Sequence, residues 1–393
     1  MAADLKKVVS SAIDEDTEEL RKLSGEIWSN PELNFKEYKA HDLLTGFLEK
    51  KGFSVERSYT GIETAFRATF GSGRPNVCVI CEYDALPEIG HACGHNLIAE
   101  AGVAAGLGLK AALESNNAPK GRLTVMGTPA EEGAGGKEYL IRNGAFEDVD
   151  IALMVHPAPY SSTNPLFNDR TQLEITYTGK AAHAAAFPWE GVNALDAAVM
   201  AYNSVSVLRQ QMKPTWRVHG VITNGGAKPN IIPEKAVIEY YIRAPNKTEL
   251  AVLREKMESC FEAAAKATNC SVEIVEPSPT YYDVINNPIL SKRFGENWSA
   301  LGTKFEDCIN TYASTDMGNV SYTVPSLHPM YAIGSGSEVN HTREFTAVAN
   351  TPEAHAETLV AAKAMAHTCI DALTTDGLLE EITKVFKARL QEQ

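Results

Sequence analysis

The sequence predicts an α/β protein in which a larger domain, with a mostly parallel sheet flanked by helices, carries an inserted ferredoxin-like α+β domain. Three observations lead to this expectation. A chain of 393 residues with 44% hydrophobic residues is long enough to form two cores. Apolar strands alternate with helical segments towards both ends of the chain. The middle of the chain instead follows the order strand-helix-strand-strand-helix-strand.

The first part of the larger domain is expected to span residues 1–170. Residues 5–27 and 36–51 carry apolar residues at helical spacing, and Asn30-Pro31 separates them because proline interrupts a helix. Short apolar runs bounded by turn residues predict buried strands. On these grounds we expect strands at 65–70, 76–83, 123–126 and 151–155, and helices at 96–113 and 136–143.

The inserted domain is expected to span residues 171–286. Apolar and polar residues alternate over 172–178, which predicts a half-buried strand. Further strands are expected at 216–223, 236–243 and 271–275, and helices at 194–212 and 248–268. The larger domain then resumes over 287–393. Its last elements are a strand at 330–333, a helix at 352–373 and an amphipathic helix at 378–390 that docks on the core.

Composition excludes several classes of function. The net charge of −14 argues against a nucleic-acid partner, and we find no apolar run that suggests a membrane partner. The charged N-terminus lacks the apolar core of a signal peptide. The chain has seven cysteines, an odd number with irregular spacing, which is typical of free thiols in a reducing compartment. We therefore expect a cytoplasmic protein.

The most informative pattern is His91-Ala92-Cys93-Gly94-His95, which is followed along the chain by Glu131-Glu132. Thiolate and imidazole groups bind zinc-like ions strongly, and a carboxylate beside a bound water can act as its base. Both motifs follow predicted strands, and His156 ends a third. Open α/β sheets place their sites at the carboxyl ends of strands. The pattern therefore predicts a metal-dependent hydrolase.

Four more polar residues need an assignment. His328 and His341 compete for the last ligand position, and we prefer His341 because it lies in a polar loop before the closing helix. In the inserted domain, His183 ends a flexible turn and Asn230 lies between prolines. Both are remote in sequence from the ligand cluster, so the residues alone favour ordinary loops.

Two hypotheses from other classes compete with the metal-dependent hydrolase. The first is a cysteine hydrolase that uses Cys93 with His95 or His91, and it leaves the glutamate pair and His156 without a role. The second is a binding module without catalysis. Loss of ligand residues would favour it, yet every expected type of ligand is present.

These motifs resemble the di-zinc aminoacylase and carboxypeptidase metallopeptidases, and within them the amidohydrolase branch. The resemblance covers nearly the whole chain. It is carried by Asp84–Pro87, His91–His95, Pro129–Glu132, His156-Pro157, Gly179–His183, Asn230–Pro233 and His341. Ile222–Gly226 and Ser314–Val320 are similar to the subgroup that contains the animal β-alanyl-lysine dipeptidase.

The resemblance implies two divalent metal ions, with zinc first and manganese or cobalt as alternatives. It implies five ligands, with Cys93 as the bridge, Glu132 and His341 on one ion, and His95 and His156 on the other. Glu131 would be the general base, and Asp84 would orient a ligand. The implied fold is the zinc-peptidase-like α/β domain with a dimerisation domain that acts as a lid.

The resemblance also implies a homodimer formed through the inserted domain. His183 would then stabilise the oxyanion in the partner's active site. Asn230, Arg243 and Asp316 would bind the substrate. The implied substrates are small dipeptides, β-alanyl or similar, with a basic C-terminal residue. A broad N-acyl-amino-acid amidohydrolase is the alternative.

The chain departs from the family pattern at two positions near the expected ligands. Other branches carry a histidine ligand where this chain has Glu82, so His95 must replace it. The amidohydrolase branch commonly has aspartate where this chain has Asn96. Asn96 changes the charge near the ions, and a bridging thiolate is compatible with zinc, manganese or cobalt, so the preferred metal stays open.

Overall fold

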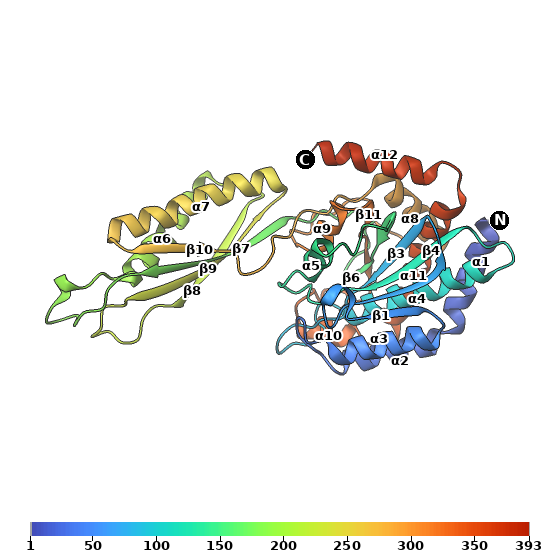
Figure 1. Cartoon of the computed structure of the whole chain (residues 1–393), viewed down its shortest axis with the longest axis horizontal. Coiled ribbons are helices and arrows are strands. Elements are labelled where there is room, and N and C mark those ends of the chain that lie inside the picture. The colour runs from blue at the N-terminus through green and yellow to red at the C-terminus, as the bar shows by residue number, and fades with distance from the viewer. Residues whose placement is uncertain (1, 393) are drawn as a thin grey trace. The chain divides into compact units, whose positions relative to one another are not determined.

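The computed structural model describes residues 2–392, and the chain folds into two units (Figure 1). The main unit comprises the chain up to Leu166 together with Val284–Glu392, and the inserted unit comprises Phe167–Asp283. These boundaries lie four residues and three residues before those expected from the sequence, 170/171 and 286/287. The insertion therefore begins just before its first strand.

The main unit is built on a six-stranded sheet whose order is β1-β2-β4-β3-β5-β11. Strands β4, β3, β5 and β11 are parallel, whereas β1 and β2 form an antiparallel edge. The bounds are β1 Ser54–Arg57, β2 Phe66–Ser72, β3 Asn76–Cys81, β4 Gly121–Gly127, β5 Ile151–Leu153 and β11 Ser326–Leu327. Two further strands, β6 His156–Ala158 and β12 Met330–Ala332, form a separate parallel pair.

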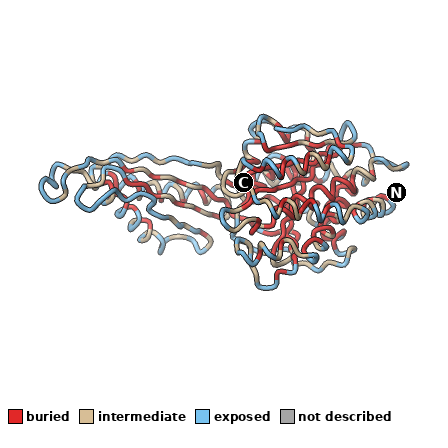
Figure 2. The backbone as a smooth tube through the Cα atoms, turned by 90° about the horizontal axis from the view of Figure 1, so that it is seen from below, coloured by how far each residue is buried: buried red, intermediate tan, exposed pale blue. Residues whose placement is uncertain are grey.

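Helices cover both faces of this sheet, which explains why β3 is an unbroken apolar run with every residue buried. Val77 and Val79 face a core shared with α1, α2, α3, α4 and α11, while Cys78 and Ile80 face a second core under α5 and α9. The helices are α1 Ala2–Glu15, α2 Thr17–Trp28, α3 Tyr38–Lys50, α4 His95–Glu114, α5 Gly136–Arg142, α8 Pro288–Ala300, α9 Met317–Ser321, α10 Arg343–Val348, α11 Pro352–Thr374 and α12 Leu378–Gln391. In Figure 2 the buried stretches, drawn in red, are concentrated in the interior of this unit.

Helix α4 is the central helix of the main core. By length and composition it is apolar enough to cross a membrane, a property that we did not expect from the sequence. Most of its residues are nevertheless buried within the main unit, as in the core helix of a folded domain. Three glycines let it pack closely. A Cβ atom at Gly102, for example, would lie 2.4 Å from the Cys81 sulfur of β3.

The inserted unit has the predicted split βαβ arrangement. Its antiparallel sheet has the order β10-β7-β9-β8, and helices α6 and α7 pack on one face. The bounds are β7 Asp169–Thr178, α6 Ala194–Leu208, β8 Arg217–Asn224, β9 Lys235–Ala244, α7 Lys247–Thr268 and β10 Ser271–Val275. Leu173, Ile175 and Tyr177 of β7 point towards the helices, and the alternate side chains form the open face of the sheet.

Candidate metal centre

The centre lies at the carboxyl ends of the parallel strands of the main unit. Glu82 and Asp84 follow β3, Glu131 and Glu132 follow β4, and His156 follows β5. These segments meet at one edge because β3, β4 and β5 run in the same direction.

His91–His95 leads into α4 beside the same edge, and Gly94 is required at this point. The φ angle of Gly94 is +78°, and a Cβ atom there would lie 2.6 Å from Cγ of Pro157. A side chain at this position would therefore strain the backbone and displace Pro157, which directly follows His156.

The structure brings the five predicted ligands together. One group contains donor atoms of Cys93, His95 and His156, all within 4.8 Å of one another, and a second contains those of Cys93, Glu132 and His341. Cys93 belongs to both groups, which is the arrangement that a bridging thiolate needs. Glu131 joins a third group with His95 and Glu132, so it lies beside the same space.

Hydrogen bonds orient two of the histidines. Nδ1 of His95 lies 2.9 Å from Oδ1 of Asp84, and Nδ1 of His156 lies 2.8 Å from the carbonyl oxygen of Pro157. Because each Nδ1 donates to an oxygen, Nε2 of each ring is turned towards the donor groups, where it could bind an ion. The other Asp84 oxygen accepts the backbone N–H of Glu132 at 2.8 Å. Asp84 thus links both donor groups, in keeping with its predicted orienting role.

The donor set fits two divalent metal ions. Nε2 of His95 and Oε1 of Glu132 are buried and have no hydrogen-bond partner among residues 2–392. Burying such atoms unpaired costs free energy, and a cation at each of the two donor groups would remove that cost. Thiolate, imidazole and carboxylate together suit zinc, and also manganese or cobalt.

The surroundings shift the pKa values of Cys93 and Glu131 in opposite directions. Burial alone would raise the pKa of the Cys93 thiol, but the imidazoles of His156, His341 and His95 hold it well below its usual range. For Glu131, burial together with the carboxylates of Glu82 and Glu132 raises the pKa well above its usual range. A carboxyl group that retains a proton more readily than usual is suited to accept and return one.

The backbone around Glu131 and Glu132 is fixed by a residue that sequence reasoning missed. Glu37, which is fully buried, accepts hydrogen bonds from the backbone N–H groups of Ala130 and Phe35, at 2.9 Å and 3.0 Å. Both of these residues have positive φ angles, +62° and +58°, which non-glycine residues rarely adopt. Glu37 therefore stabilises the strained turn that presents the glutamate pair.

The structure distinguishes the two C-terminal histidines. His341 lies with its Nε2 3.5 Å from Oε1 of Glu132, and its backbone N–H bonds to the carbonyl of Ala92. His328 is fully buried, and its ring packs edge-on against that of His156 with centroids 5.7 Å apart. His341 is thus a member of a donor group, whereas His328 packs against the ring of His156.

Three other residues near the centre have their side chains turned away from it or enclosed. The amide of Asn96 donates to Ser24 and to the carbonyl of Ala349, so it joins α4 to its neighbours in the core. His91 is buried, and burial first and His95 second lower its pKa to about 4, which keeps the ring neutral. Asp316 is fully buried and accepts one hydrogen bond from the Lys137 side chain and one from its backbone N–H. Its expected contact with a substrate remains a prediction.

The inserted unit brings together the two loops that carry His183 and Asn230. His183 pairs with Ile231 as an isolated bridge, and the N–H of Ala184 donates to the carbonyl of Asn230 at 3.1 Å. The exposed His183 ring accepts the N–H of Ala186 through Nδ1 at 3.2 Å. The two motifs therefore form one surface, which their distance along the chain concealed.

Arg243 belongs to a row of three arginines across the open face of the inserted sheet. It lies opposite Arg170 of β7 on one side and Arg217 of β8 on the other. Directly opposed residues share a face, and like charges placed there repel. Arg170 is buried, with its guanidinium 4.1 Å from the ring centroid of Tyr281 and 4.9 Å from that of Tyr241.

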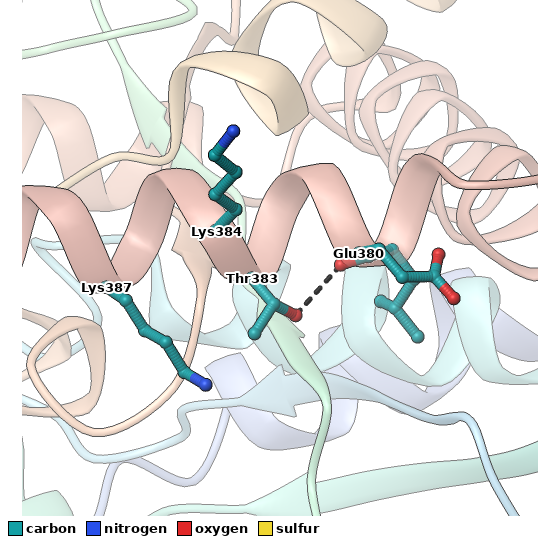
Figure 3. A pocket seen from close by; sticks show the side chains of 5 residues that line it. Glu380, Thr383, Lys384 and Lys387 are labelled. Carbon is teal, nitrogen blue, oxygen red and sulfur yellow. Dashed lines mark hydrogen bonds between the residues drawn. The ribbon is translucent and has the colours of Figure 1, made fainter.

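Figure 3 shows a hollow beside α12, far from these groups in sequence. Its lining consists of Leu379, Glu380, Thr383, Lys384 and Lys387. The Thr383 hydroxyl is occupied, because it donates to the carbonyl of Leu379 at 2.8 Å. None of the residues predicted to bind metal or substrate lines this hollow.

Comparison with known proteins identifies relatives along the whole chain. Residues 170–269 match the family described as the peptidase dimerisation domain. The chain is 49% identical to the mouse (Mus musculus) Xaa-Arg dipeptidase, over 99% of this chain and 94% of the relative. It is 30% identical to a p-aminobenzoyl-glutamate hydrolase polypeptide of Escherichia coli (strain K12), over 95% of this chain and 93% of the relative.

A solved structure shares the fold. The Bacillus subtilis YXEP protein, described as a dinuclear metal binding peptidase from the M20 family, matches with a TM-score of 0.69. The match covers 92% of this chain and 99% of that protein, at 19% identity. At this level of sequence identity, the structural match shows a common fold.

Proposed function

Because this chain belongs to the M20 family of metal-dependent peptidases, we propose that it hydrolyses the amide bond of small dipeptides that end in a basic residue. The mouse relative, named for Xaa-Arg substrates, supports the basic C-terminal residue. The resemblance noted from the sequence adds a β-alanyl or similar N-terminal residue.

One observation carries the proposed chemistry, namely that two donor groups share Cys93 while Glu131 lies beside both. Two bound divalent ions would supply a water of lowered pKa and would polarise the scissile carbonyl. Cys93, His95 and His156 would hold one ion, and Cys93, Glu132 and His341 the other. Glu131 would accept the proton of the water and pass it to the leaving amine.

Side chains of the inserted unit would bind the C-terminal carboxylate and the carbonyl of the substrate. The arginine row places positive charge around Arg243, and a bound carboxylate would offset the repulsion within the row. Arg243 would therefore bind the C-terminal carboxylate of the dipeptide. His183 and Asn230 would stabilise the oxyanion and hold the carbonyl, since the structure places their loops together.

A homodimer through the inserted unit completes this proposal. Residues 170–269 match a dimerisation domain, and the edge strand β8 exposes Ile222, which lies opposite Ile238 on the helix-covered face of the sheet. Helix α6 exposes Val199, Met200 and Val207, the last with 76% of its surface accessible. Apolar side chains gathered on one exposed helix and the adjoining sheet edge are typical of an interface. The cytoplasm would suit the seven free cysteines.

The first experiment measures metal content and substrate preference on the same preparation. Protein purified without chelator should contain about two divalent ions per chain, as a dinuclear site requires. It should hydrolyse β-alanyl-lysine and β-alanyl-arginine with a higher kcat/KM than carnosine, N-acetyl amino acids or hippurate. A preference for N-acetyl amino acids or hippurate would favour the broad amidohydrolase instead.

The Glu131→Gln variant tests the role of Glu131 as the general base. It should keep both ions while kcat falls by about 100-fold or more, since an amide cannot take the proton. Wild-type turnover in this variant would remove Glu131 from the mechanism. Full activity in metal-free enzyme that is lost on mild alkylation would favour Cys93 as a nucleophile instead.

A further inference from the structure

Arg170 is a buried cation at the inner end of the arginine row, and the proposed function does not yet use it. Only 4% of its surface is accessible, and its Nη2 has no hydrogen-bond partner among residues 2–392. Its guanidinium lies over the rings of Tyr281 and Tyr241, which attract a cation but do not neutralise its charge. A buried charge without a counter-ion is costly, and an anion bound nearby would lower that cost.

The glutamates on the same face of β7 and β9 lie further along these strands. Glu174 shares the face of Arg170 because four residues separate them, and Glu239 is paired directly with Glu174. Four residues of a strand span about 13 Å, and the pair of Gln172 with Tyr241 lies in between. The charge of Arg170 is therefore not neutralised by these glutamates.

Exposure changes along the row, from buried Arg170 through half-buried Arg243 to exposed Arg217. Arg243 lies directly opposite Arg170, so an anion held by Arg243 would also lie near the charge of Arg170. Arg217 is tied to its own loop, because its Nη1 donates to the carbonyls of Pro214 and Trp216. We propose that Arg170 supplies a fixed positive charge for the carboxylate that Arg243 binds, and thereby selects substrates with a free C-terminal carboxylate.

This inference rests on the proposed function, because it takes the C-terminal carboxylate of the dipeptide as the ligand of Arg243. Contacts with two tyrosine rings hold the Arg170 guanidinium in place before any ligand binds. A charge that is fixed beforehand loses little side-chain entropy on binding, and burial weakens its screening by salt. Arg170 thus acts through its charge on a ligand that Arg243 contacts, so it determines specificity and is not a catalytic residue.

Two substrates that differ only in the carboxylate test this role, namely β-alanyl-arginine and its C-terminal amide. Wild type should prefer the acid. Arg170→Met removes the charge but keeps an unbranched side chain that packs against the tyrosines. It should reduce the preference for the acid by about 10–100-fold, through a higher KM for the acid at nearly unchanged kcat. Arg170→Lys keeps the charge and should retain most of the preference.

Arg217→Met is the matched control. Arg217 also lies directly opposite Arg243, and its substitution removes the same charge, but from an exposed position where water screens it. This variant should keep the wild-type preference within about twofold. Calorimetric binding of the acid and the amide to Glu131→Gln protein, with and without Arg170→Met, gives the same comparison without turnover. Arg170→Gln replaces Arg170→Met if the latter does not fold.

The outcomes separate this inference from the proposed function. If Arg170→Met impairs the acid and the amide equally, or impairs neither, Arg170 does not select the carboxylate. An equal effect in Arg217→Met, or equal impairment in Arg170→Lys and Arg170→Met, would also overturn the inference, because neither burial nor charge would then explain the effect. If wild type binds the acid more tightly than the amide but hydrolyses neither, the proposed reaction fails while the carboxylate site stands.

Discussion

Single residues in this protein act through what holds them in place as much as through their own chemistry. Glu131 and Glu132 are easily found in the sequence, because a glutamate pair follows an apolar strand and precedes glycines. Glu37 is not, since nothing in its neighbourhood along the chain distinguishes it from a surface glutamate. Only the fold shows that it is fully buried and bonded to the turn that carries the glutamate pair.

A residue outside the centre allows a prediction of pH dependence. Asp169 of the inserted unit is fully buried and accepts the backbone N–H of Asp283. Burial first, and the Asp283 carboxylate second, raise its pKa to about 8. In the unfolded chain this pKa is about 3.9. Between these two values the folded protein retains a proton that the unfolded chain has lost.

Stability should therefore be lost as pH rises from about 4 to about 8, by about 1.4 kcal/mol per pH unit for one proton. Asp169→Asn removes this proton and keeps an oxygen for the Asp283 N–H. The difference in Tm between Asp169→Asn and wild type should thus grow in favour of the variant from pH 5 to pH 8. A difference that stays constant with pH would show that Asp169 titrates normally.

At the scale of elements, the sequence predicted the long helices and most of the strands but missed several short elements. The predicted strand at 271–275 has the observed bounds, and the helix at 352–373 differs by one residue from α11. The expected helix at 5–27 is instead two helices, α1 and α2, which meet at Asp16. Thr17 caps the end of α1 through a hydrogen bond to the carbonyl of Asp14.

Several elements of two to six residues were not predicted, because their sequences have no usable periodicity. Strands β1, β6 and β11 and helices α9 and α10 are of this kind, and tertiary contacts rather than pattern define them. The mostly parallel sheet is confirmed for β4, β3, β5 and β11, whereas the antiparallel edge was not expected. Registers such as Arg170 opposite Arg243 require knowledge of the sheet order, which the sequence does not contain.

The turn before α5 offers a test of how strictly an element positions the glutamate pair. A Cβ atom on Gly136, the first residue of α5, would lie 1.8 Å from the carbonyl oxygen of Pro129. Gly136→Ala should therefore displace the Pro129-Ala130 turn, and with it Glu131. Because small misplacements of catalytic groups are costly, we expect kcat/KM to fall by about 100-fold.

Gly46 supplies the control for this substitution. It lies within α3, and a Cβ atom placed on it would have nothing within 4 Å, so alanine meets no obstacle. Gly46→Ala should keep full activity and raise stability by about 0.5–1 kcal/mol. If Gly136→Ala were as active as Gly46→Ala, the turn would not need glycine to present Glu131.

At the scale of the whole molecule, chemistry is divided between two units with separate cores. The main unit holds the donor groups, whereas the inserted unit holds His183, Asn230 and the arginine row. Sequence reasoning from residues alone assigned His183 and Asn230 to ordinary loops, and only the family resemblance gave them a role. Their adjacency in the fold supports that role, while the subunit that His183 serves stays a prediction.

Heterodimers made from two inactive variants can decide which subunit His183 serves. Glu131→Gln lacks the base but keeps His183, and His183→Ala lacks the oxyanion donor but keeps the base. Each homodimer should be slower than wild type by about 100-fold or more. If His183 acts across the dimer, a heterodimer has one site with both groups, because the Glu131→Gln chain lends its His183 to the other chain.

Such a heterodimer, purified through a different tag on each chain, should regain about half of the wild-type kcat, one competent site of two. The physical reason is symmetry, since in a two-fold dimer each chain lends its His183 to the site of the other chain. The two variants together therefore leave one site with both groups and one site with neither. If His183 serves its own chain, both sites lack one group, and the heterodimer stays as slow as the homodimers. Size-exclusion chromatography with light scattering on the same samples verifies the dimer, so a monomeric protein would be recognised and would itself contradict the prediction.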